Sequence, residues 1–223
     1  MSLWIKICGT TSLEDALLAA EAGADAVGFV FAPSPRRVTQ AEVAAIVPQL
    51  PEAIEKIGVF VDAELEEIAS AVRSCGLTGV QLHFDAEPKL PTMIHKRLGP
   101  QLRILRVIHF DGENAEQQAK RIAEFERDPH VSGVLVDSRT ASAAGGTGVR
   151  FDWIEARESL FARRGRLKLV AAGGLNPVNV AEATTMLRPW GVDTVSGVEA
   201  APGRKDAAKV REFVARAKLA GGS

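Results

Sequence analysis

The sequence predicts an α/β fold, namely a single (β/α)8 barrel (TIM barrel) over residues 1–223. Short β-branched runs alternate strictly with longer segments of helical period, and the alternation can be counted eight times. No break in composition and no linker divides the chain, so we expect one domain. A doubly wound sheet is the structural alternative, but the turn after the first strand reads CGTTSLEDA rather than GxGxxG.

The expected strands are short apolar runs, and each is followed by a helical stretch. They lie at residues 3–8, 26–31, 56–61, 79–83, 102–109, 133–137, 167–172 and 192–196.

The stretches between these runs space their apolar residues as helices do. Ser12 and Thr39 are expected N-caps because both precede such a stretch. The fourth helix, within EPKLPTMIHKRLG, is the least regular because Pro91 interrupts it. The clearest helices are SLEDALLAAEAG, TQAEVAAIVPQL, AELEEIASAVRSCG, ENAEQQAKRIAEFERD and KDAAKVREFVARAKLA.

Composition excludes several classes of partner. Hydrophobic residues make up 46% of the chain, and 27 Lys and Arg residues face 28 Asp and Glu residues, a net charge of −1. Nothing therefore draws the whole surface to nucleic acid or to an anionic membrane. The start, MSLWIKICG, lacks a signal-peptide pattern, and no apolar run reaches the roughly 18 residues of a membrane span. We expect a cytoplasmic protein.

The two cysteines, Cys8 and Cys75, lie far apart without CxxC spacing. This spacing argues against a disulfide framework and against a zinc site, and it fits a reducing cytosol. We expect free thiols and no bound metal. Cys75, near a helix end, is interpreted as a packing residue.

In a barrel, chemistry lies at the carboxyl ends of the strands. The period of two places Cys8 and Lys6 on one face of the first strand, and Asp137 on one face of the sixth with Leu135. Cys8 and Asp137 are thus candidates for facing each other across the barrel mouth. The alternatives are a buried apolar role for Cys8 and a turn or cap role for Asp137.

Gln81 and His83 share one face of the fourth strand, and His83 could equally be a core histidine. Two glycine loops are more specific. AAGGL, with Gly173 and Gly174, follows the seventh strand, and SGVE, with Ser196 and Gly197, follows the eighth. Barrels often bind phosphate in these two loops through backbone N–H groups, where a side chain would hold the backbone away from the anion. The sequence therefore predicts a barrel of the phosphate-binding type, acting on a small phosphorylated molecule.

At these residues the chain resembles the phosphoribosylanthranilate isomerase family of tryptophan biosynthesis. The resemblance runs from Lys6 to about Lys209. It rests on KICGTT, GADAVGFVF with SPR, IGVFVD, VQLH, VDSRT with GGTGVRFDW, AGGLNPVNV and GVE with PGRKD.

The resemblance implies an Amadori rearrangement of N-(5-phosphoribosyl)anthranilate to 1-(2-carboxyphenylamino)-1-deoxyribulose 5-phosphate, without metal or cofactor. It implies that Cys8 is the general base, Asp137 the general acid and Arg36 the contact for the anthranilate carboxylate. Asp193 matches an aspartate near the site, and we expect Gln81 and His83 to line it. The glycines expected to frame the substrate and its phosphate are Gly145, Gly146, Gly148, Gly173, Gly174 and Gly197, beside Ser196.

The chain departs from the family pattern at Phe84, where the family has glycine, and at Val195, where it more often has serine. The sequence leaves three alternative functions. A histidine-pathway aldose isomerase would have aspartate in place of Cys8, and an epimerase would need metal ligands such as His83, Asp62 and Asp137. A catalytically silent binding barrel would not need Cys8 or Asp137. We expect a monomer, with a homodimer as the alternative.

Overall fold

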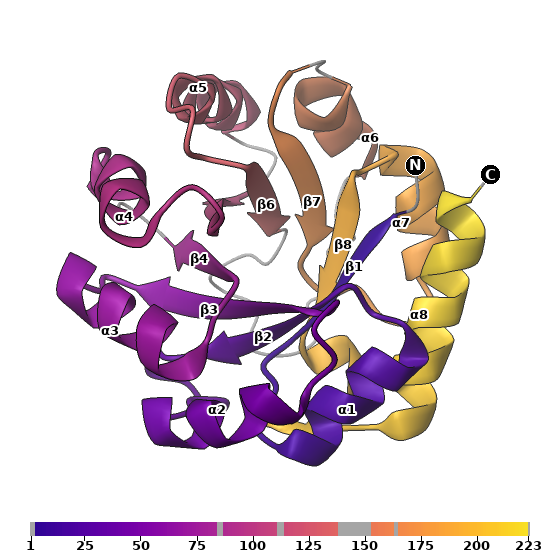
Figure 1. The fold of residues 1–223 in the computed structure, drawn as a ribbon. Helices are drawn as coiled ribbons and strands as arrows, with labels where there is room; N and C mark the ends of the chain where they lie inside the picture. Colours follow the sequence, from indigo (N-terminus) through magenta and orange to yellow (C-terminus); the bar gives the residue numbers. More distant parts are fainter. Residues whose placement is uncertain (1–2, 84–86, 111–113, 138–152, 163–164, 223) are drawn as a thin grey trace.

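Eight parallel strands close into a barrel, in chain order, in the computed structural model of the protein. The structure describes residues 3–83, 87–110, 114–137, 153–162 and 165–222. The first strand pairs with both the second and the eighth, which completes the ring. Helices surround it, and the last helix packs against the first and against the one before it (Figure 1). The predicted (β/α)8 barrel is confirmed.

The strands lie within one or two residues of their predicted bounds. They are β1 (Trp4–Cys8), β2 (Ala26–Val30), β3 (Glu55–Val61), β4 (Gly79–His83), β5 (Arg103–His109), β6 (Gly133–Asp137), β7 (Lys168–Ala172) and β8 (Gly191–Thr194).

The two predicted N-caps, Ser12 and Thr39, are confirmed at the starts of α1 and α2. Ser12 caps α1 by accepting a hydrogen bond from the Asp15 N–H at 3.1 Å, and Gly23 ends it in the left-handed region. The remaining helices are α2 (Gln40–Ile46), α3 (Leu65–Cys75), α4 (Leu90–Leu98), α5 (Ala115–Glu126), α6 (Trp153–Ala156), α7 (Val180–Leu187) and α8 (Ala207–Gly221), after α1 (Leu13–Ala22). Short turns of other helical pitch are η1 (Val47–Gln49), η2 (Arg157–Phe161) and η3 (Ser196–Val198).

Two sequence expectations about local structure are wrong. Pro91 does not interrupt α4, because it lies in the first turn, where its missing N–H has no helical partner to lose. The eighth strand ends at Thr194, and Ser196 belongs to η3. Between η3 and α8 the chain also forms an unpredicted antiparallel hairpin, β9 (Glu199–Ala201) with β10 (Arg204–Lys205).

The core has two layers, as strand alternation requires. The outer layer packs the strands against the helices, as Ile5 and Ile7 of β1 do. The inner layer fills the barrel and includes Trp4, Leu135 and Ala172. Residues two positions apart therefore share a layer, so Lys6 and Cys8 point inward with Trp4, and Asp137 points inward with Leu135.

The amino end of the barrel is closed by stacked aromatic rings. Trp4 lies 5.0 Å from Trp190 between ring centroids, and the Arg103 guanidinium lies over both rings. Glu55 accepts from Arg103 at 2.6 and 3.0 Å and from the Trp4 indole N–H at 3.2 Å. This end is packed, which leaves the carboxyl end for chemistry.

Ser12→Ala should lower the free energy of unfolding by about 1 kcal/mol, because the Asp15 N–H at the start of α1 loses its acceptor. Urea unfolding followed by circular dichroism measures the difference. Ser12→Thr, which keeps the hydroxyl, is the control and should retain most of the stability. An unchanged midpoint for Ser12→Ala would show that the cap contributes nothing.

Candidate active site

Cys8 and Asp137 end their strands at the carboxyl mouth of the barrel. Cys8 is the last residue of β1, Asp137 is the last of β6, and each is 3% exposed. Both belong to the inner layer, as the period of two predicts. A β-carbon at Gly28 of β2 would lie 2.6 Å from Cys8 Sγ and 3.0 Å from Lys6 Cε, so both side chains lie over this glycine. The predicted pair thus lines the inside of one mouth.

Lys6 occupies the barrel centre, one layer below Cys8, and is fully buried. Its ammonium donates to Asp193 Oδ1 at 2.8 Å and to Gln81 Oε1 at 3.0 Å. Gln81 Nε2 in turn lies 2.9 Å from His83 Nε2. Residues of β1, β4 and β8 are therefore joined across the interior, and the predicted residues Asp193, Gln81 and His83 do meet in one network.

The charge of Lys6 is secured by its neighbours. Burial alone would lower the pKa of Lys6, but the Asp193 carboxylate and Cys8 raise it above the ordinary 10.5. Lys6 therefore stays an ammonium at neutral pH.

A second group of ions covers the mouth on the β8 side. Glu199 of β9 accepts from Arg36 Nε at 2.7 Å and from Arg36 Nη2 at 2.6 Å. Lys205 of β10 donates to Glu199 Oε1 at 3.2 Å, to the Cys8 carbonyl at 2.6 Å and to the Val195 carbonyl at 3.2 Å. Arg36, predicted to bind a carboxylate, is thus held at the mouth by a carboxylate of the protein itself.

Burial affects the pKa values of two members of this group, Lys205 and Glu199. Burial is the largest influence on Lys205 and lowers its pKa below 10.5, although Glu199 and Cys8 oppose the change. Burial disfavours the charge of Glu199 as well, but hydrogen bonds from Arg36 and the charge of Lys205 hold its pKa below 4.5. Glu199 therefore remains a carboxylate throughout the neutral range.

The loops after β7 and β8 lie against each other. The Leu175 carbonyl accepts from Thr194 Oγ1 at 2.6 Å. A β-carbon at Gly197 would collide with that same carbonyl, so only glycine allows this approach. Gly173 and Gly174 follow one another with φ of 90° and 70°, a conformation that other residues rarely adopt.

Ser196 begins η3 beside Gly197. Val195, which departs from the family pattern, contributes its backbone carbonyl to Lys205. The predicted residues Gly145, Gly146 and Gly148, and the departure at Phe84, lie outside the described residues.

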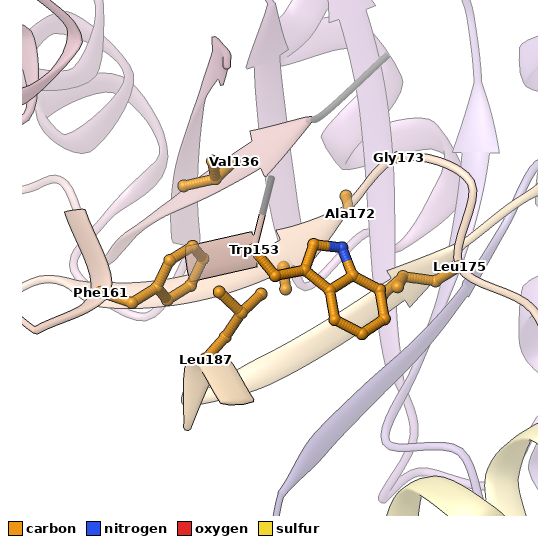
Figure 2. Close-up of a pocket in the computed structure, with 8 residues that line it drawn as sticks. Val136, Trp153, Phe161, Ala172, Gly173, Leu175 and Leu187 are labelled. Carbon is orange, nitrogen blue, oxygen red and sulfur yellow. The ribbon is translucent and has the colours of Figure 1, made fainter. Parts of the chain in front are cut away.

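A small apolar cavity lies beside this mouth, with a volume of about 10 Å³, room for roughly one water molecule. Figure 2 shows the Phe161 ring near Leu187 and Val136 and the Trp153 indole extending toward Leu175, with Gly173 in the loop beside them. The described residues of its wall are apolar side chains and Gly173, and they pack α6 and η2 against β7.

The sequence pattern did not identify Glu199 or Lys205 as parts of the mouth. Both stand in the GVE and PGRKD motifs, but nothing in their spacing indicates the hairpin that folds them together. Lys6 carried a clearer signal, because a lysine at an inward position of an apolar strand requires a buried counter-charge.

Cys75 is buried in α3 and directs its thiol toward the Gln40 carbonyl at 3.4 Å, in line with a packing role. Among the described residues, no three His, Cys, Asp or Glu side chains are grouped to hold a metal ion. No helix in the described part of the chain has the length and apolar character needed to cross a membrane.

The family model described as N-(5'phosphoribosyl)anthranilate (PRA) isomerase matches residues 5–216. The chain belongs to the phosphoribosylanthranilate isomerase family. The N-(5'-phosphoribosyl)anthranilate isomerase of Trichlorobacter lovleyi is 45% identical over 217 residues, which cover 97% of this chain and 98% of that protein.

Solved structures of the phosphoribosylanthranilate isomerase family have the same fold as this chain. The enzyme from Thermotoga maritima has a TM-score of 0.82 at 36% identity, covering 97% of this chain and 99% of that one. A family structure in complex with reduced 1-(o-carboxyphenylamino)-1-deoxyribulose 5-phosphate has a TM-score of 0.80 at 34% identity, with the same coverage.

Lys6→Met should lower the free energy of unfolding by about 3–5 kcal/mol, because it leaves the Asp193 charge buried without its partner. Guanidinium unfolding at neutral pH measures the loss. The double variant Lys6→Met with Asp193→Asn should lose less than the two single losses combined, because it buries no charge. Simple additivity would contradict a direct ion pair.

The same interaction predicts a pH dependence. The pKa of Lys6 is raised on folding, so its contribution is fully present below the unfolded value of 10.5 and is lost as the pH rises through the folded value. The stability of wild type relative to the double variant Lys6→Met with Asp193→Asn, which has neither ionisable group, should therefore fall only as the pH becomes strongly alkaline.

Proposed function

We propose that this protein is a phosphoribosylanthranilate isomerase of tryptophan biosynthesis. It converts N-(5-phosphoribosyl)anthranilate to 1-(2-carboxyphenylamino)-1-deoxyribulose 5-phosphate. The observation that carries the proposal is the inward-facing pair of Cys8 and Asp137 at one barrel mouth, with Lys6 beneath the thiol, in a chain of this family.

Asp137 is the general acid of the first step. It donates its proton to the ribose ring oxygen as the bond from that oxygen to C1 breaks. The lone pair of the anthranilate nitrogen forms the C1–N double bond, which gives an open-chain iminium ion. Asp137 ends β6 at the carboxyl mouth of the barrel, where its side chain is 3% exposed and can reach a substrate bound there.

Cys8 is the general base of the second step. Its thiolate takes the proton from C2, and the electron pair of that C–H bond forms the C1–C2 double bond and neutralises the iminium nitrogen. The resulting enolamine then becomes the ketone, by moving a proton from the C2 hydroxyl to C1. The iminium ion is the electron sink, so the rearrangement balances without an oxidant, a reductant or a cofactor.

Binding is assigned to the rest of the mouth. Arg36 contacts the anthranilate carboxylate, because guanidinium groups form paired hydrogen bonds with carboxylates. Backbone N–H groups of the loops carrying Gly173, Gly174 and Gly197 bind the phosphate. Asp193, with Gln81 and His83, faces the ribose from the barrel interior. The expected setting is the cytoplasm, and the expected state is a monomer, which sedimentation of the purified protein tests.

The decisive experiment for the function follows the loss of anthranilate-type fluorescence when purified protein meets phosphoribosylanthranilate. Cys8→Ala and Asp137→Asn should each lower kcat by roughly 10² to 10⁴, the usual contribution of a positioned base or acid. Cys75→Ala, which removes the other thiol, is the matched control and should keep its activity. Activity of either mouth variant within about threefold of wild type, well short of that loss, would remove its assigned role.

Inorganic phosphate should compete with the substrate, because the loops after β7 and β8 offer N–H donors to a dianion. We expect millimolar phosphate to raise the apparent KM, leave kcat unchanged and raise the melting temperature. Chloride at matched ionic strength is the control. Equal effects of the two anions would mean that these loops hold no specific phosphate site.

A further inference from the structure

Arg36 is fixed by a side chain to which the reaction scheme gives no task. Glu199 accepts two hydrogen bonds from the Nε and Nη2 edge of its guanidinium, at 2.7 and 2.6 Å. Such a paired contact defines the plane as well as the position of the guanidinium, unlike a single bond. Only 18% of the Arg36 side chain is exposed, and 4% of the Glu199 side chain.

Glu199 is itself anchored to the strand ends. Lys205, whose side chain is fully buried, donates to Glu199 Oε1 and to the backbone carbonyls of Cys8 and Val195. The Gly203 N–H also donates to Glu199 Oε1, at 3.3 Å. A continuous series of contacts therefore runs from the end of β1, through Lys205 and Glu199, to Arg36.

From this geometry we propose that Glu199, anchored by Lys205, is a positioning residue that holds Arg36 at a fixed place relative to Cys8 for the arylamine carboxylate of the substrate. The inference rests on the proposed function, since it needs a substrate with that carboxylate. The contact with the Cys8 carbonyl is its central feature. Through this contact Arg36 is held at a fixed distance from β1, the strand that carries Cys8. Binding of the aryl carboxylate by Arg36 then determines where C2 of the substrate lies relative to Cys8.

The hairpin of β9 and β10 supports this role. A ring of strands followed by helices does not need it, yet it brings Glu199 and Lys205 back over the mouth. Lys205 and Glu199 are buried and Arg36 is partly buried, and burial of such charges costs free energy unless they hold each other in place. A surface turn without a positioning role would have no need of buried ions.

Glu199→Gln tests the proposal, because glutamine keeps the size but cannot accept from both Arg36 nitrogens. We expect KM to rise on the order of tenfold, with kcat changed by less than about twofold. In an Arg36→Ala background, which already has a raised KM, adding Glu199→Gln should raise KM no further. Glu199→Asp, which keeps the charge on a shorter side chain, should give an intermediate KM.

The matched control is Glu55→Gln. Glu55 makes the same two-bond contact with Arg103, at 2.6 and 3.0 Å, but at the amino end of the barrel. This variant should lose stability without a change in KM. A substrate analogue that carries an aniline ring without the carboxylate gives a second readout, because Glu199→Gln should leave its KM equal to that of wild type.

The outcomes separate the two proposals. If the wild type does not convert phosphoribosylanthranilate, the proposed function fails and this inference fails with it. If the wild type is active and Glu199→Gln keeps its KM, or raises KM equally in the Arg36→Ala background, only the inference is overturned. Should Glu199→Gln fail to fold, Glu199→Asp with both substrates decides by the same criteria.

Discussion

The buried ammonium of Lys6 is the constraint around which the barrel interior is arranged. Moving such an ion from water into an apolar interior carries an idealised cost of about 20 kcal/mol. The cost is met because Asp193 and Gln81 approach from β8 and β4, at 2.8 and 3.0 Å. Those strands must therefore keep one register relative to β1, and Cys8, two residues further along, is placed by the same register.

Each end of the barrel has a paired Arg–Glu contact, but the two contacts have different surroundings. At the amino end, Arg103 and Glu55 form a paired contact, and the Arg103 guanidinium lies over the stacked rings of Trp4 and Trp190. At the carboxyl end a comparable Arg–Glu contact, with Glu199 as the acceptor, has the barrel mouth beside it. An ion pair against packed rings can only stabilise, whereas an ion pair at the mouth can also orient a ligand.

The fold was predictable because alternation of strand and helix is local, and the inward face of each strand follows from a period of two. The inward positions of Cys8 and Asp137 at the ends of their strands were predicted in this way. Glu199 and Lys205 were not, since their contacts depend on a two-residue strand of the hairpin, too short for any periodic signal. Pro91 misled because proline in a helical stretch is harmful only after the first turn. The partner of Lys6 lies 187 positions along the chain, and only closure of the barrel brings Asp193 to it.

The pKa values of Lys6 and Lys205 shift in opposite directions although both residues lie close to Cys8. Burial is the largest influence on both lysines, but at Lys6 Asp193 and Cys8 together outweigh it and raise the pKa, whereas at Lys205 burial prevails and lowers the pKa. At Lys205 the Glu199 carboxylate opposes burial and raises the pKa, as Asp193 does at Lys6. Cys8 therefore lies between the two ion networks, because the Lys6 side chain lies beside its sulfur atom over Gly28 and the Lys205 ammonium donates to its backbone carbonyl.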